Sequence, residues 1–147
     1  MTEPILGSEF EAIPAMVLAW NAHDIEGLLR CFASDFRSDH PIHPNRSFRG
    51  TTQIRQNWEK IFGVIPDLKA ELLRFALSSD ENAVWIECRW HGTHADGSRY
   101  DRRGVMICGV RNKLIEWMRA FTDPVDETGP GVNEALDEAL KLPRPSK

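Results

Sequence analysis

The segment DFRSDHPIHPNRSFRG, residues 35–50, gathers side chains that are able to move protons. An imidazole titrates near neutral pH, which makes His40 the first candidate for a general base. Asp39 is a second candidate, but in a strand its side chain points to the side opposite that of His40. Prolines follow His40 and His43 and bias both residues away from helical geometry. Two interpretations stay open for this segment: one wall of a reaction pocket, or a polar surface loop whose groups pair with one another.

A second group of polar side chains follows in the predicted strands. His91 lies two residues after Arg89 and offers another imidazole base, while Arg89 or Arg119 would stabilise negative charge on a substrate oxygen. A surface ion pair between Glu87 and Arg89 is the competing interpretation. Four aromatic side chains are candidates for the wall of an apolar substrate pocket, with core packing as the alternative: Trp20, Trp58, Trp117 and Phe121.

Neither a metal nor a cofactor is expected. His40 and His43 are three residues apart, as are His91 and His94, and in a strand such pairs point to opposite faces. No nucleophile sequence and no glycine-rich phosphate loop is present. The three cysteines lack metal-ligand spacing and are expected to be buried free thiols: Cys31, Cys88 and Cys108.

The elements that must position these groups follow from the hydrophobic periodicity. Apolar residues at helical spacing predict three helices, over about residues 10–22, 25–32 and 52–62, with Asp24 as the cap of the second. Alternation then predicts strands over about residues 67–78, 83–92, 99–110 and 114–121, separated by the turn sequences SSDEN, HADGS and RNK. Helices followed by an antiparallel meander indicate an α+β fold with the helices on one face of the sheet.

The pairing of the strands decides which side chains share a face. If Asp96-Gly97 is a two-residue turn, His91 lies opposite Arg102, and if Arg111-Asn112 is the next turn, Arg102 lies opposite Phe121. One face then mixes charged and aromatic side chains: Glu87, Arg89, His91, Arg102, Met106, Trp117, Arg119 and Phe121. The other face is nearly all apolar: Ile86, Cys88, Trp90, Val105, Ile107, Met118 and Ala120.

Two arrangements of these faces are open. In the first, the apolar face meets the helices and the charged face is solvated, as is usual for a half-exposed sheet. In the second, the charged face lines a cavity under the helices. The apolar face would then lie outside and be covered by a second copy of the chain.

Length and composition exclude several classes of protein. The 147 residues predict one domain, with a core over about residues 8–125 and a tail over about residues 126–147. The tail is expected to hold a short acidic helix with its apolar residues, among them Val132, Leu136 and Leu140, on an inner side. A net charge of −4 gives no electrostatic footprint for nucleic acid. Without a secretory signal or a membrane-spanning run, we expect a cytoplasmic protein.

Three segments and the order of the elements resemble the nuclear-transport-factor-2-like superfamily, and within it the SnoaL-like group of polyketide cyclases, ketosteroid isomerases and limonene-epoxide hydrolases. The segments are WNAHDIEGLLRCFASDF (20–36), DHPIHPNRSFRG (39–50) and KLIEWMRAFTDP (113–124). The resemblance implies a cone-shaped, curved antiparallel sheet packed against three N-terminal helices, followed by the C-terminal tail. It also implies that the charged face and the 35–50 segment enclose a pocket.

The resemblance further implies where catalytic groups would lie. Ketosteroid isomerases have an aspartate before proline as the base, where this chain has His40-Pro41. Epoxide hydrolases of this fold have an Arg-x-Asp pair where this chain has Arg89-Trp90-His91, and an aspartate on the last strand where this chain has Arg119 or Ala120. Neither set of acids is complete, so no specific activity is transferred.

The main hypothesis is a cofactor-independent enzyme that uses general acid–base chemistry on an apolar, oxygenated ligand held in the cone. Isomerase, cyclase and hydrolase types remain open. The alternative is a non-catalytic SnoaL-like module that binds a ligand or dimerises. A homodimer is expected in the first case as well.

Overall fold

The computed structural model of the chain describes residues 6–79 and 82–143. The first half contains a 3-10 turn, η1 (Ser8–Phe10), and three helices, α1 (Ala12–Ala22), α2 (Ile25–Leu29) and α3 (Thr52–Val64). Between α2 and α3 lie β1 (Phe32–Asp39), the 3-10 turn η2 (Pro44–Arg46) and the two-residue strand β2 (Phe48–Arg49). The second half contains β3 (Lys69–Leu77), β4 (Ala83–Thr93), β5 (Arg99–Arg111), β6 (Leu114–Pro124) and the helix α4 (Val132–Ala139). The centre of the predicted SSDEN turn, residues 80–81, lies outside the described residues.

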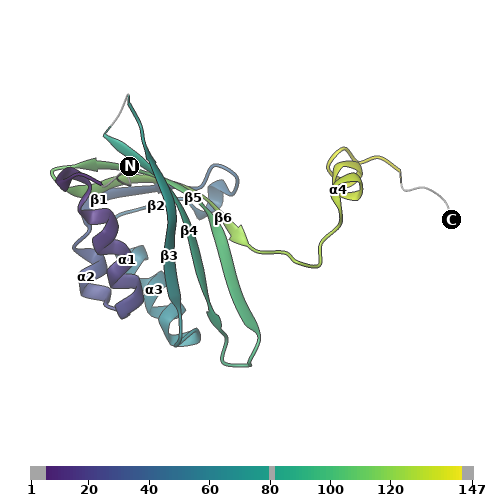
Figure 1. Cartoon of the computed structure of the whole chain (residues 1–147), viewed down its shortest axis with the longest axis horizontal. Coiled ribbons are helices and arrows are strands. Elements are labelled where there is room, and N and C mark those ends of the chain that lie inside the picture. The colour runs from purple at the N-terminus through teal and green to yellow at the C-terminus, as the bar shows by residue number, and fades with distance from the viewer. Residues whose placement is uncertain (1–5, 80–81, 144–147) are drawn as a thin grey trace, which may run out of the picture.

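The strands form one six-stranded sheet in the order β2-β1-β6-β5-β4-β3. Strand β1 runs parallel to β6, and every other neighbouring pair is antiparallel. The long strands curve, and α1, α2 and α3 lie together on one side of them (Figure 1). The predicted α+β class, with three N-terminal helices against a curved sheet, is therefore confirmed.

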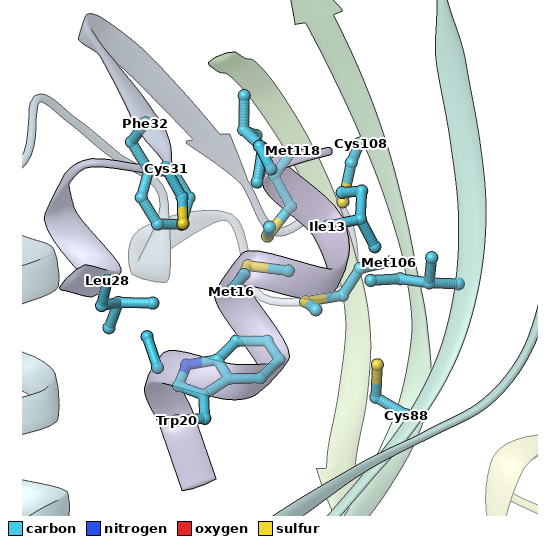
Figure 2. Close-up of a cluster of buried hydrophobic side chains, with 14 of the residues drawn as sticks. Ile13, Met16, Trp20, Leu28, Cys31, Phe32, Cys88, Met106, Cys108 and Met118 are labelled. Carbon is cyan, nitrogen blue, oxygen red and sulfur yellow. The ribbon is translucent and has the colours of Figure 1, made fainter. Parts of the chain in front are cut away.

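Helix α1 fills the concave side of the sheet. It buries Ile13, Met16 and Trp20, and Figure 2 shows these side chains near the sulfur atoms of residues from the facing strands, Cys88, Met106, Cys108 and Met118. The side chain of Asn21 fixes the end of α1 to β3, because its amide donates to the oxygen of Ala70 at 3.0 Å and its carbonyl accepts from the Ala70 N–H at 2.8 Å. As predicted, Asp24 caps α2 by accepting from the Gly27 N–H at 2.9 Å.

The register of both central hairpins differs from the predicted one. His91 pairs with Asp101 and Trp90 with Arg102, one residue away from the pairing that a two-residue turn requires. The loop is longer than two residues because Asp96 accepts from both the N–H and the hydroxyl of Ser98. The pair of strand residues nearest to the loop is therefore Thr93 and Arg99.

The β5–β6 turn is also one residue later than predicted. Asn112 and Lys113 form it, both with positive φ, as a type I′ turn requires. An irregularity after Gly109 then shifts the register again. Arg102 consequently lies opposite Pro124, and Thr122 lies opposite Gly104.

Because of these shifts, the residues of β5 lie on the face opposite to the predicted one. The residues of β4 and β6 keep their predicted faces, because each of the two register errors reverses the relation between neighbouring strands once. Arg102 and Met106 lie on the apolar face beside Trp90 and Ile86, whereas Val105 and Ile107 lie on the charged face. The apolar face is buried against the helices: Ile86, Cys88, Trp90, Met106, Met118 and Ala120 are all less than a tenth exposed. The arrangement in which the charged face lines the cavity and the apolar face is a dimer interface is therefore wrong. We call the helix-covered side the inner face and the other side the outer face.

The tail contains the short helix that the sequence predicts, but its apolar side does not face the domain. Val132, Leu136 and Leu140 are 82%, 54% and 59% exposed. Figure 1 places α4 on the side of the sheet opposite the other three helices. The predicted inward packing of this helix is wrong within the described chain.

Candidate functional site

A cavity of about 410 Å³ lies between α1, α3 and the inner face. Its wall is mainly aromatic and aliphatic, and the aromatic members are Trp20, Phe32, Phe36, Phe48, Trp58, Trp90 and Tyr100. The polar and charged members are Ser38, His40, Asn57, Lys60, Arg102 and Thr122. The described lining contains no carboxylate, so its charged groups are cationic. A cavity of this kind suits an apolar ligand that carries oxygen atoms.

His40 faces this cavity from the end of β1. Ser38 and His40 are two residues apart and therefore lie on the same side of the strand, with 3.2 Å between Ser38 Oγ and His40 Nε2. The His40 N–H donates to Ser47 Oγ at 3.0 Å, which holds the following loop against the strand end. The 35–50 segment thus contributes Phe36, Ser38, His40 and Phe48 to the cavity wall.

The surroundings of His40 favour its neutral form. Burial lowers the pKa of the His40 imidazole below its ordinary value, and the positive charges of Arg102 and Arg46 lower this pKa further. His43 acts in the same direction, and Asp39 weakly opposes it. A neutral imidazole has a free lone pair, so His40 is able to accept a proton at neutral pH.

Arg102 is the second polar group of the site, and the sequence did not single it out. Its Nε donates to Thr122 Oγ1 at 3.1 Å and its Nη2 donates to the Thr122 carbonyl at 3.0 Å. No carboxylate of the described residues lies within 4.0 Å of its guanidinium, although the side chain is partly buried. An unpaired cation in an apolar cavity is costly unless a ligand supplies the negative charge. Pairing with the inner-face residue Trp90 could have revealed Arg102. The assumed two-residue turn instead paired Arg102 with His91 and so placed it on the outer face.

Tyr100 and two indoles add further polar groups to the cavity wall. Burial raises the pKa of the Tyr100 phenol, and contact with Arg102 partly offsets this effect, so the phenol stays protonated at neutral pH. Within the described residues, the buried Nε1 atoms of Trp20 and Trp90 have no hydrogen-bond partner. Trp20 packs between Trp58 and Trp90, with ring centroids 5.3 and 5.4 Å away. Trp20 and Trp58 thus lie in the cavity wall, and their substrate-binding role stays a prediction.

Asp39 points away from the cavity, as strand alternation predicts. It forms an ion pair with Arg37 at 3.2 Å. Outside the cavity lining, Asp123 accepts from His43 at 3.2 Å and lies 3.7 Å from Arg46. The side chain of Asp39 is therefore not placed beside that of His40.

The other predicted site residues lie on the outer face. Arg89 pairs with the largely buried Asp101 at 3.2 Å, and His91 lies 3.3 Å from Glu71. A groove on the same face is lined by Trp117, Arg119 and Phe121, among others. The sheet separates all five from His40, so their predicted catalytic or substrate-binding roles stay predictions that the proposal below does not use.

The three cysteines are buried and free, as predicted. Burial raises the pKa of Cys31 to about 11 and that of Cys88 to about 12, so these thiols are poor nucleophiles. Across residues 6–79 and 82–143 no cluster of three potential metal ligands occurs. Within the same residues, every helix is too short or too polar to cross a bilayer.

Comparison with known proteins identifies the type of domain. The sequence profile of the SnoaL-like domain matches residues 13–118. No curated protein has a significantly similar sequence. Solved structures resemble the chain closely in fold at low sequence identity.

Three of these structures share most of the chain. IdmH from Streptomyces antibioticus, proposed to be a polyketide cyclase, is 19% identical with a TM-score of 0.68, over 80% of this chain and 93% of that chain. A proposed isomerase from Bacillus subtilis is 16% identical with a TM-score of 0.69, over 89% and 91% of the two chains. The protein RV0760c from Mycobacterium tuberculosis, in complex with estradiol-17beta-hemisuccinate, is 20% identical with a TM-score of 0.67, over 78% and 94%. At these identities the similarity establishes the fold.

Proposed function

Because the chain belongs to the SnoaL-like domain family, we propose that its cavity binds an apolar, oxygenated small molecule and performs cofactor-independent acid–base chemistry on it. The observation that carries this proposal is the combination of a neutral imidazole, His40, with an arginine that lacks a carboxylate partner, Arg102, in one aromatic cavity. The steroid ester bound to RV0760c and the proposed activities of IdmH and the Bacillus subtilis protein are consistent with such a ligand.

The proposed reaction begins with proton transfer to His40. The imidazole takes a proton from a carbon next to a carbonyl group, and the electron pair of that C–H bond forms an enolate. Arg102 donates hydrogen bonds to the enolate oxygen, and the protonated Tyr100 beside it is a second donor. Ser38 orients the imidazole, because its hydroxyl lies within hydrogen-bond distance of Nε2.

Two outcomes complete the reaction without an external reagent. In an isomerase, protonated His40 returns the proton to a different carbon of the enolate. In a cyclase, the enolate carbon attacks a second carbonyl of the same molecule, and His40 protonates the new alkoxide. The two types share the first step, so the first step is the one to test.

The experiment is hydrogen–deuterium exchange of the ligand. Apolar aromatic and steroid-like ketones are incubated with the protein in D2O, and deuterium at the carbon next to the carbonyl is followed by NMR. We expect exchange with wild type and at least about a 100-fold loss of rate in His40→Ala. His91→Ala is the matched control, since its imidazole lies on the outer face, and it should leave the rate unchanged. Full exchange in His40→Ala would exclude His40 as the base.

A non-catalytic binding module is the second candidate, and one observation favours it. The described cavity lining has no carboxylate to assist the imidazole. In that case, ketones would raise the thermal unfolding midpoint of wild type but not of Arg102→Gln, and no deuterium would enter the ligand.

A further inference from the structure

The C-terminal helix α4 presents an apolar stripe that nothing in the described chain covers. Val132, Leu136 and Leu140 recur every four residues and lie on one side of the helix, and each is more than half exposed. Gly129, Pro130 and Gly131 precede the helix and separate it from β6. We call residues 125–142 the C-terminal arm.

The outer face of the sheet holds a complementary apolar groove. We define the outer-face groove by Trp85, Val105, Ile107, Trp117, Arg119 and Phe121. Trp85 is 48% exposed and Phe121 36% exposed. Contiguous exposed apolar surface of this kind marks a site of association. The chain thus carries two uncovered apolar surfaces of matching type, a narrow stripe and a groove.

The charges of the two surfaces are opposite. Within α4 the charged side chains are all acidic, and Asp137 flanks the apolar stripe, one residue after Leu136. Arg119 is exposed at the groove, and in the described part of the chain it forms no ion pair. Opposite charges at the edges of two apolar surfaces favour one orientation of docking and speed the encounter.

We propose that two copies of the chain exchange their C-terminal arms, so that α4 of each copy lies in the outer-face groove of the other. Leu136 and its neighbours on the stripe would pack on Trp85 and Trp117, and Asp137 would pair with Arg119 of the second copy. Figure 1 supports a second copy as the occupant, because the arm extends away from its own sheet on the outer side. A copy whose outer face is turned toward this one would therefore lie within reach of the arm. This inference does not depend on the proposed function.

The first test is the mass of the full-length protein in sedimentation equilibrium. We expect a dimer at micromolar concentration, and we expect its dissociation constant to increase by at least about tenfold in Leu136→Asp. Leu18→Asp is the matched control, since Leu18 is an exposed leucine of α1 (71%) that lies in neither surface, and it should not change the mass. A monomeric wild type, or an unchanged dimer in Leu136→Asp, would overturn the proposal.

The second test distinguishes exchange between copies from packing of an arm on its own sheet. One chain carries Asp137→Cys and the other Arg119→Cys, and the two are mixed and oxidised. Exchange predicts a disulfide between the two different chains. A third chain carries both substitutions. If a disulfide forms within that chain and none forms between the two singly substituted chains, exchange is overturned and the groove is assigned to the arm of the same copy. Circular dichroism of each variant checks that the fold is intact.

Discussion

His40 is placed by its neighbours to act as an uncharged base. Its ring lies 3.2 Å from the buried hydroxyl of Ser38, and the positive charges of Arg102 and Arg46 disfavour a further positive charge on it. Burial and like charge act in the same direction, so the imidazole keeps its lone pair at pH values where an exposed histidine is partly protonated. The pH dependence of any reaction that needs this lone pair should therefore show the lowered pKa.

The pH dependence of ligand deuteration tests this property. The rate should rise with pH as His40 loses its proton, with a midpoint below the ordinary histidine value of about 6.5. Arg46→Gln removes one of the positive charges and should move the midpoint upward. Arg49→Gln is the control, because Arg49 is an exposed arginine of the same segment that is not among the charges identified as lowering the pKa of His40. A midpoint at or above the ordinary value in wild type would contradict the assigned surroundings.

The same shift links the protonation of His40 to stability. The folded protein binds this proton less readily than the unfolded chain does. The contribution of His40 to the free energy of unfolding is therefore complete at pH values above the pKa that His40 has in the unfolded chain. It is lost as pH falls through the lower pKa that His40 has in the folded protein.

Arg102 should affect turnover far more than folding. Replacing it in Arg102→Gln removes the donors for the developing oxyanion, and a loss of about 100-fold or more in exchange rate is expected. The thermal midpoint should stay near that of wild type, because no described carboxylate loses a partner. Arg103→Gln is the matched control, since this neighbouring side chain lies on the outer face beside Asp101 at 3.6 Å. Equal losses in both variants would contradict an inner-face role for Arg102.

At the scale of the strands, the β4–β5 loop decides which arginine enters the cavity. Asp96-Gly97 is a strong signal for a two-residue turn, and the strand alternation gave no reason to doubt it. The two hydrogen bonds between Asp96 and Ser98 lengthen the loop and move β5 by one residue. A shift of one residue exchanges the two faces of a strand. Arg102 therefore lies on the inner face and Val105 on the outer face, the reverse of the predicted placement. Local side-chain bonds of this kind are not visible in hydrophobic periodicity.

The β5–β6 pair should be intolerant of a side chain at Gly104. A Cβ added there would lie 2.2 Å from the Phe121 carbonyl oxygen, and the residue has a φ of +158°. Because backbone atoms of a central strand have no room to move, we expect Gly104→Ala to lower the free energy of unfolding by about 3 kcal/mol. Chemical denaturation measures this change.

The control for that variant lies in helix α3. Gly63 has open space around its would-be Cβ, and its replacement by alanine should raise the free energy of unfolding by about 0.5 kcal/mol. A small effect of Gly104→Ala, comparable to that of Gly63→Ala in size, would contradict the close approach of β5 and β6.

For the molecule as a whole, the sequence predicted the layers better than the surfaces. The change from helical to alternating periodicity placed three helices before the meander, and the structure confirms this order. The predictions failed where contact with another part of the molecule decides the outcome. The two-residue strand β2 pairs only because β1 offers Arg37 and Ser38 as partners, and the apolar side of α4 does not face the domain that precedes it.

Arm exchange predicts how the molecule responds to concentration and salt. The thermal midpoint of the full chain should rise with protein concentration, whereas a chain ending at Thr128 should show a weaker dependence. High salt should weaken the dimer, because it screens the pairing of the acidic arm with Arg119. Sedimentation at low and high salt measures this effect, and a dimer that is indifferent to both salt and truncation would contradict the charge complementarity.

The cavity wall combines a hydrogen-bonded polar group with flexible apolar side chains. Two hydrogen bonds tie Arg102 to Thr122, while the wall also includes the thioethers of Met106 and Met118. Methionine side chains are unbranched and polarizable, and they change rotamer at little cost. A ligand of a new outline would be accommodated by the methionines while its carbonyl kept its position at the arginine. Such a pocket would be able to acquire new substrates during evolution before any of its reacting groups changed.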